Sequence, residues 1–396
     1  MAQSISQEAI GATGLPGATA ASRHAGATAS GAPTTGTFAV GDYVVDQTGA
    51  MYVCTVAGTP GTWQLSGVSV NENIAGKNFV INGGMDIWQR GTSFALSSSL
   101  AYTADRWVNY SSTPTTVSQI ASGLTGFQYA LRVQRNSGSS ATSYIPTVYN
   151  MESKNSYPLA GQTVTLSFWA RAGANYSSTS NLLNIFLQSG TGTDQNQYNG
   201  YYTGSTLPVN TTLTLTTSWQ RFTYTCAIPS NSTQVGFEAY YTPTGTAGTN
   251  DYFDITGVQL EIAPQATPFS RAGGSIGGEL ALCQRYYYQM SGSNGTGGIA
   301  IDIASGQVFA SNQIDFMWQF PVTMRAIPSI SASSGTNYFI AYTYYTLYYV
   351  NTISAAYDQS IYSSRIRIAP SGAVGGQGAI LGTQYAAAYV AASAEL

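Results

Sequence analysis

The chain has 396 residues, of which only 8% are charged, and a formal net charge of −3. Ordinary soluble domains carry about 25% charged residues. The low charge, together with 29 Tyr and 43 Gly, is typical of extracellular β-structure and unlike a helical cytosolic enzyme. A nucleic-acid partner is not expected, because binding phosphates requires clustered Lys and Arg.

Segments for export or membrane insertion are not expected. No run of about 20 apolar residues occurs, as a transmembrane helix would need, and the N-terminal MAQSISQEAI lacks the basic and apolar regions of a signal peptide. The three cysteines, Cys54, Cys226 and Cys283, are widely spaced, which indicates isolated thiols rather than disulfides or a zinc site. An exported composition without an export signal suits a virion component that is assembled in a host cytoplasm.

The N-terminal residues 1–35 are low in complexity and are predicted to form a flexible arm, since three Gly-X-Y triplets are too few for a collagen helix. Residues 36–66 contain strand-like runs at Tyr43–Val45 and Met51–Val56, separated by the turn sequence DQTG. They are predicted to form a small β attachment module, too short to be stable alone. A polar linker is expected at 67–78.

Residues 79–275 are predicted to form a jelly-roll β-sandwich. In VTLSFWARA, Val164, Leu166 and Phe168 alternate with polar residues, and Trp169 must point away from Phe168. Similar segments are LLNIFLQSG, TLTLTTSWQRFTYTCAI, QVGFEAYYTP and YFDITGVQLEIA, separated by Gly, Asn, Ser and Pro. The expected fold class is all-β: a multi-domain, fibre-like chain with this sandwich at its centre.

Residues 276–396 are predicted to form a C-terminal β-rich tip domain that begins with a short helix. In IGGELALCQRYYYQM (276–290), Leu280, Cys283 and Tyr287 recur at helical spacing. From residue 291 onward, short strand-like runs alternate with glycine-rich turns.

The tip domain contains the stretch NYFIAYTYYTLYYVN (337–351), with seven aromatic side chains, six of them Tyr. Read as one strand, both faces are apolar, so a neighbouring subunit or a ligand must cover one of them. A helix is the alternative, although Tyr and Thr favour strands. We expect a subunit interface with hydroxyls at its rim that reach a receptor. The predicted ligand-binding tyrosines are Tyr342, Tyr344, Tyr345 and Tyr348.

Arg365 and Arg367 lie two residues apart, on one face of a predicted strand of the tip domain. They are either a solvated edge that discourages aggregation or anchors for acidic sugars or phosphate. We include both among the predicted ligand-binding residues. The tryptophans are open to a similar choice, between burial and stacking on a sugar.

Enzyme activity is not expected. The single histidine, His24, lies in the low-complexity arm, which leaves Ser-His-Asp, Cys-His and zinc sites without a histidine. Glycoside hydrolysis requires only two carboxylates. Those of the β-region are Asp86, Asp105, Glu152, Asp194, Glu238, Asp251, Asp254 and Glu261. Since no β-helix repeat is visible, a glycan depolymerase is kept only as an alternative.

Four segments resemble bacteriophage tail fibre and receptor-binding tail proteins. They are NFVINGGMDIWQRGTSF (78–94), YTADRWV (102–108), VQLEIAPQATPFSRAGGSIGGELALCQRYYYQM (258–290) and FPVTMRAIPSI (320–330). The module ending in GTPGTW is similar to units near the N-terminal ends of such proteins. The region from INGGMDIW to ITGVQLEIA also resembles the jelly roll of carbohydrate-binding modules. The pattern departs at FSRAGG, where the family more often carries an acidic or basic pair around Arg271.

The resemblance implies a viral tail fibre protein of the virion that attaches to the host cell surface by binding an envelope glycan, without catalysis. It implies a homotrimer whose N-terminal region contacts other tail or baseplate proteins. No cofactor is expected except a structural calcium ion, for which the similar positions are Asp86 and Asp254. A structural baseplate or fibre-linking component is the other alternative.

Overall fold

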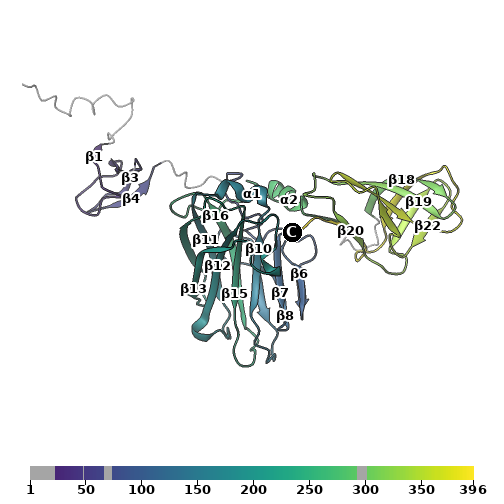
Figure 1. Ribbon diagram of the computed structural model, residues 1–396, viewed down its shortest axis with the longest axis horizontal. Helices are drawn as coiled ribbons and strands as arrows, with labels where there is room; N and C mark the ends of the chain where they lie inside the picture. The colour runs from purple at the N-terminus through teal and green to yellow at the C-terminus, as the bar shows by residue number, and fades with distance from the viewer. Residues whose placement is uncertain (1–22, 48, 67–73, 292–300) are drawn as a thin grey trace, which may run out of the picture. The chain divides into compact units, whose positions relative to one another are not determined.

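The computed structural model describes residues 23–47, 49–66, 74–291 and 301–396. It divides into two compact units, Met1–Glu72 and Asn73–Leu396. β-strands dominate both units, which confirms the predicted all-β fold class (Figure 1). The predictions for residues 1–22 and 67–73 lie outside the described residues. No helix among the described residues is long and apolar enough to cross a membrane.

The first unit contains a sheet of four strands in the order β1-β2-β3-β4. Their bounds are β1 His24–Gly26, β2 Tyr43–Val45, β3 Met51–Val56 and β4 Thr62–Leu65. β1 pairs with β2 in parallel, and Arg23 beside it forms an ion pair with Asp42 at 2.7 Å. Part of the segment predicted as a flexible arm is therefore a strand of the small module, because its backbone completes the edge of β2.

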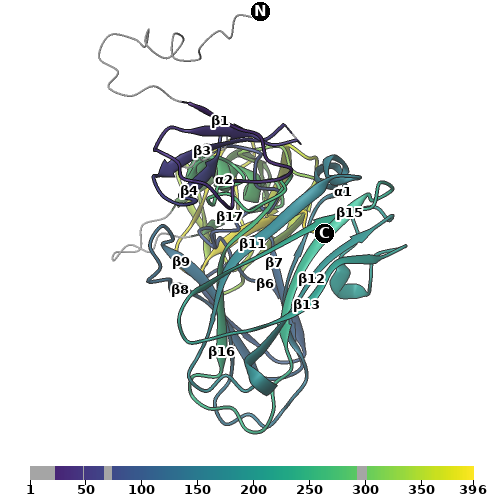
Figure 2. The same ribbon diagram turned by 90° about the vertical axis from the view of Figure 1, so that its left-hand side faces the viewer.

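The second unit begins with a β-sandwich of two six-stranded sheets, which confirms the predicted jelly roll. The sheet orders are β13-β12-β15-β10-β7-β6 and β14-β11-β16-β9-β8-β5. The bounds are β5 Ser93–Leu96, β6 Ser99–Tyr102, β7 Trp107–Ser111, β8 Thr115–Ala121, β9 Tyr129–Arg135, β10 Ile145–Asn150, β11 Thr163–Ala172, β12 Leu182–Gly190, β13 Thr206–Thr214, β14 Gln220–Ala227, β15 Gln234–Tyr241 and β16 Tyr252–Glu261. In Figure 2, β8, β9 and β16 lie on one side of the sandwich and β12, β13 and β15 on the other.

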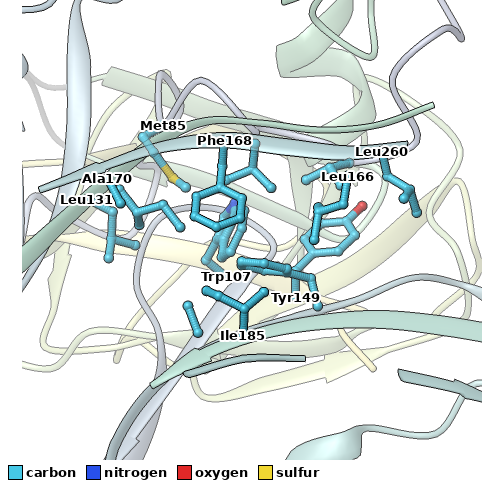
Figure 3. Packing of buried hydrophobic residues seen from close by; sticks show 14 of the residues in the cluster. Met85, Trp107, Leu131, Tyr149, Leu166, Phe168, Ala170, Ile185 and Leu260 are labelled. Carbon is cyan, nitrogen blue, oxygen red and sulfur yellow. The ribbon is translucent and has the colours of Figure 1, made fainter. Parts of the chain in front are cut away.

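The core between the two sheets follows from the alternation along the strands. Leu166, Phe168 and Ala170 of β11 face inward and pack near Trp107 and Ile185 (Figure 3). All five side chains are fully buried, as expected for residues that stabilise the sandwich by leaving water. The neighbour of Phe168 on the strand, Trp169, is half-buried on the opposite face, as the alternation predicted.

The helix predicted at 276–290 is shorter than expected. α2 spans Ile276–Gln284, and Tyr287–Ser291 form a strand, β17, that pairs with β26 (Tyr389–Ser393). The three consecutive tyrosines favour the strand once a partner edge is present. Cys283 of α2 lies in the core of the sandwich, whereas the prediction assigned this helix to the tip domain.

The remaining strands enclose a second core in a C-terminal domain. A seven-stranded sheet has the order β22-β21-β25-β18-β19-β24-β23, and a three-stranded sheet has the order β17-β26-β20. The bounds are β18 Ile301–Ala310, β19 Gln313–Gln319, β20 Ser329–Ala332, β21 Phe339–Thr343, β22 Leu347–Val350, β23 Ala355–Tyr357, β24 Ser363–Ile368 and β25 Gly378–Thr383. Phe316, Trp318 and Phe339 are the largest buried side chains of this core.

The aromatic stretch 337–351 is a hairpin, not the single strand or the helix that the sequence suggested. β21 and β22 pair antiparallel, and the hydroxyl of Thr343 donates to the carbonyl of Thr346 across the turn at 2.8 Å. The division into two faces that a single strand predicts is therefore wrong. Phe339 and Ala341 pack into the core, while Tyr344 lies in the turn.

The last residues of the chain bind to the sandwich. The guanidinium of Arg325 donates to the carbonyl of Ala394 at 2.8 Å and pairs with Asp194 at 2.9 Å. The Glu395 carboxylate pairs with Arg90 at 3.0 Å and with the buried Arg106. These contacts join the C-terminal domain to the sandwich through charged groups that are largely removed from water.

Candidate functional site

The structure places the predicted ligand-binding tyrosines in three different environments. Tyr344 and Tyr345 lie in the hairpin turn, 82% and 78% exposed, with their ring centroids 4.3 Å apart. Tyr348 is buried in the core of the C-terminal domain, and Tyr342 is half-buried. The four residues therefore do not form one binding surface.

The predicted arginine pair lies on one face of β24, where both guanidinium groups meet Asp315 of β19. Nε of Arg367 lies 2.6 Å from an Asp315 oxygen, and Nη1 of Arg365 lies 3.4 Å from the other oxygen. Partial burial opposes the charge of Asp315, but the hydrogen bonds from Arg367 and Gln313 outweigh it, and the pKa of this carboxyl is lowered. Both arginines thus have an internal counter-ion.

The predicted calcium ligands are also paired with arginine. Asp254 accepts from Arg132 at 2.7 Å and from Arg171 at 2.8 Å, so both carboxylate oxygens are occupied. Asp86 pairs with Arg271 at 2.9 Å. Calcium requires six to eight oxygen ligands, and guanidinium groups in those positions do not fit a calcium ion. The described residues contain no cluster of three or more metal-ligating side chains.

A different site lies on the outer face of the first sheet of the sandwich. On β15, Phe237, Ala239 and Tyr241 face the core, so the alternate residues Glu238 and Tyr240 face outward. The strand register places Glu238 between Phe186 of β12 and Val148 of β10. These residues form the floor of a cavity of about 330 Å³, which we call the sheet cleft.

The sheet cleft is rich in aromatic side chains. The Tyr240 ring lies 5.3 Å from Phe186 and 5.8 Å from Tyr144, as measured between ring centroids. Tyr198 and Tyr201 come from the segment between β12 and β13, and Tyr201 is 69% exposed. Rings from two strands, from the residue before β10 and from one loop therefore surround a single opening.

The loop that carries Tyr198 and Tyr201 is fixed to the sheet by Asn150. The side chain of Asn150 accepts from the Tyr202 hydroxyl at 2.8 Å and from the backbone N–H of Gln197 at 2.9 Å. The Gln197 amide donates to the carbonyl of Phe237 at 3.0 Å. Gly236 permits this approach, because a Cβ there would collide with the Tyr202 hydroxyl. The wall of the cleft is therefore held in place by buried polar contacts.

Glu238 supplies the charge of the sheet cleft. Burial raises the pKa of its carboxyl to about 7. Burial and the negative charge of Glu238 also raise the pKa of Tyr240 and of Tyr144. Among the described residues, no hydrogen bond or ion pair to the Glu238 side chain is present, and its lining neighbours include no Lys or Arg.

The arrangement suits binding of a small, flat, partly polar ligand. Aromatic faces pack against apolar C–H surfaces, and hydroxyl, amide and carboxyl groups fix the orientation of the ligand. The sequence reasoning named Glu238 only among many carboxylates and did not select the tyrosines of the cleft. The signal was available in LLNIFLQSG and QVGFEAYYTP, where Phe186, Glu238 and Tyr240 alternate with core residues.

A larger cavity of about 470 Å³ lies elsewhere in the second unit, lined among others by Ala75, Lys154 and Leu282. We assign no site to it, because its lining is largely apolar and, among the described residues, includes Lys154 as its one charged side chain.

Comparisons with known proteins gave similarities in structure alone. No protein-family model matches the chain, and no curated protein matches it. A CBM22-2 xylan-binding domain from Paenibacillus barcinonensis Xyn10C is 14% identical and covers 40% of this chain and 92% of its own, with a TM-score of 0.28. A CBM 22 xylan-binding domain is 15% identical and covers 45% and 98%, with a TM-score of 0.29. An arabinose-bound GH51 α-L-arabinofuranosidase is 15% identical and covers 48% and 27%, with a TM-score of 0.30. Because these TM-scores are below 0.5, the similarities carry no argument about this chain.

Proposed function

We propose that this chain is a glycan-binding protein, that the sheet cleft is its binding site, and that it acts without catalysis. The observation that carries the proposal is the preformed cleft of about 330 Å³, with rings on its walls and one carboxyl on its floor. A cleft that is already shaped in the free protein loses little entropy when it binds.

The binding mode follows from the lining residues. Tyr240 and Phe186 would pack against one face of a sugar ring, and Tyr201 would close over it from the loop. Pairs of aromatic rings contribute about 0.5–1.5 kcal/mol beyond area burial, and we take a ring packed on a sugar face to be of the same order. A few such contacts give weak affinity for one site, so several sites acting together are needed for firm attachment.

The proposed biological role is that of a viral tail fibre protein that attaches a bacteriophage virion to the host cell surface. This part rests on the resemblance of segments such as NFVINGGMDIWQRGTSF to tail fibre proteins. A homotrimer would suit this role, because three copies would present three sheet clefts to one surface. The N-terminal module would contact other tail or baseplate proteins. The location is then the virion tail fibre, after synthesis in the host cytoplasm.

The test compares binding of the purified full chain to intact bacteria and to the same cells stripped of surface polysaccharide. The Tyr240→Ala variant should lose adsorption to intact cells, and stripping should abolish adsorption of the unaltered chain. Tyr349→Ala is the matched control, because Tyr349 is 44% exposed and lies outside the cleft. Equal adsorption of the Tyr240→Ala variant and the unaltered chain would contradict the site.

A further inference from the structure

Glu238 differs from the other acidic residues that the structure describes. Every other described Asp or Glu, apart from the exposed Asp302, forms an ion pair or accepts a hydrogen bond. Asp254, for example, has two arginines, and Glu279 accepts from the backbone N–H of Gly273 at 2.7 Å. Glu238 has no such partner, although it lies on the floor of a cavity.

Leaving a partly buried carboxyl without a partner is unfavourable, because the charged form loses water without gaining a compensating interaction. The surroundings of Glu238 do not correct this, since the lining of the sheet cleft contains no Lys, Arg or His among the described residues. Most other buried acids among the described residues pair with arginine, and Glu261 and Glu279 accept hydrogen bonds instead. The missing partner is therefore a property of this cleft.

The walls around Glu238 favour a cation for a second reason. The faces of tyrosine rings carry negative charge density and attract alkylammonium groups. Tyr144, Tyr198, Tyr201 and Tyr240 line the cleft together with Phe186. Rings on the walls and one carboxylate on the floor are both complementary to a positively charged nitrogen.

We propose that the sheet cleft binds a glycan through a positively charged alkylammonium group, with the Glu238 carboxylate as its counter-ion and the surrounding tyrosine rings as its walls. The two sources of this chemistry are the free amine of an amino sugar and the quaternary ammonium of a choline substituent. The inference rests on the proposed function, because it specifies the ligand of the same cleft. It excludes N-acetylated sugars as the preferred ligand, since acetylation removes the charge.

The experiment uses two matched pairs of probes with the full chain and measures dissociation constants by NMR titration. Choline and 3,3-dimethylbutan-1-ol differ in charge but hardly in shape, and so report the effect of the charge alone. Glucosamine and N-acetylglucosamine report the amino sugar. We expect the charged member of at least one pair to bind about tenfold more tightly. The pair that shows the preference identifies the source of the cation.

The variant Glu238→Gln should lose most of the preference for the charged member of each pair, because only the tyrosine rings still favour it, with little change in affinity for the neutral member. The matched control is Asp302→Asn, which removes one exposed acid from the C-terminal domain. Equal affinity for charged and neutral probes in the unaltered chain would overturn the inference. If the unaltered chain shows no charge preference but still binds neutral sugars, and Tyr240→Ala abolishes that binding, the proposed function stands without the inference about the cation.

The pH dependence gives an independent readout, because the charge of choline does not change with pH. Binding should strengthen as pH rises through about 7, where Glu238 ionises. The other titratable groups that line the cleft are the hydroxyls of Tyr144, Tyr198, Tyr201 and Tyr240, and tyrosine ordinarily titrates near pH 10. Affinity for choline that stays constant between pH 5 and about 8 would overturn the role of Glu238.

Discussion

The sheet cleft and the outer face of the C-terminal sheet resemble each other in composition but differ in their electrostatics. Each has aromatic side chains and a central carboxylate on the outer face of a β-sheet. In the C-terminal sheet, Asp315 lies between Arg365 and Arg367, so the charges satisfy one another. In the sheet cleft, Glu238 has only rings and neutral groups around it. The charges of the C-terminal sheet are therefore balanced within the chain, whereas Glu238 lacks the counter-ion that, in our proposal, the ligand supplies.

The comparison predicts that removing the central charge has opposite effects on stability in the two regions. Asp315→Asn should lower the free energy of unfolding by about 2–3 kcal/mol, because Arg367 loses its counter-ion and Arg365 keeps only the exposed Asp358 at 2.8 Å. The figure lies below that of a fully buried pair, since Arg365 and Arg367 are partly exposed to solvent.

Urea denaturation, followed by tryptophan fluorescence, measures this loss; Trp318 is a buried reporter within the same domain. Asp302→Asn on the neighbouring strand β18 is the control and should change the stability by less than about 0.5 kcal/mol. An unchanged midpoint for Asp315→Asn would mean that the two arginines do not depend on Asp315, and the contrast between the regions would be lost.

The second prediction concerns binding by the aromatic walls. Tyr240→Ala should raise the dissociation constant for the glycan about tenfold or more, since Tyr240 contacts both Phe186 and Tyr144 and its loss opens the floor of the cleft. Calorimetric titration with an oligosaccharide that the unaltered chain binds measures this dissociation constant. An equal loss in Tyr349→Ala would show that the tyrosines of the C-terminal domain bind the same ligand, which contradicts the separation drawn here.

The third prediction gives the sign of the pH dependence of stability. Burial raises the pKa of Glu238 from 4.5 to about 7, so the native state binds more protons than the unfolded state within this window. Stability therefore falls as pH rises from about 4.5 to about 7, and the full penalty is present above pH 7. Glu238→Gln should accordingly raise the free energy of unfolding by about 1–2 kcal/mol at pH 8.

At pH 4 both chains carry an uncharged side chain at position 238, and the difference should vanish. Parallel urea titrations at the two pH values measure the effect. The control Asp302→Asn should leave the free energy of unfolding nearly unchanged at both. Destabilisation by Glu238→Gln at pH 8 would imply that Glu238 has a cationic partner in the free protein.

Sequence alone predicted much of the fold because the sandwich obeys local rules. Alternation in VTLSFWARA placed Phe168 and Trp169 on opposite faces, and the structure agrees, with Phe168 in the core and Trp169 half-buried. It failed at 337–351, where a turn at Tyr344 interrupts residues 338–350, which contain no Gly, Pro or Asn to mark it. Such a turn depends on the pairing of β21 with β25 and β22, which is a property of the whole sheet rather than of the segment.

The candidate site was harder to predict than the fold, for a physical reason. Glu238 and Phe186 are 52 residues apart in sequence and meet through the register of β15 with β12. The sequence shows how many charges a chain has, but the absence of a partner beside one of them appears only when the strands are paired. Composition therefore predicted ligand binding by the tyrosines of the hairpin, whereas the unpaired carboxyl lies in the sandwich.

A substitution in the hairpin turn should have the smallest effect on stability, and it separates the role of the hairpin from that of the sheet cleft. Tyr344 is 82% exposed and its only ring contact among the described residues is with Tyr345 in the same turn. Tyr344→Ala should therefore change the free energy of unfolding by less than about 0.5 kcal/mol, because almost no buried area is lost.

Adsorption to bacteria tests the receptor contact that the sequence predicts for Tyr344. If adsorption falls while binding of glycan to the isolated chain in solution is unchanged, the hairpin is a second, independent contact with the cell surface. If both are unchanged, attachment depends on the sheet cleft alone. A large loss of stability would instead show that the turn packs against another copy of the chain, as the expected homotrimer interface requires.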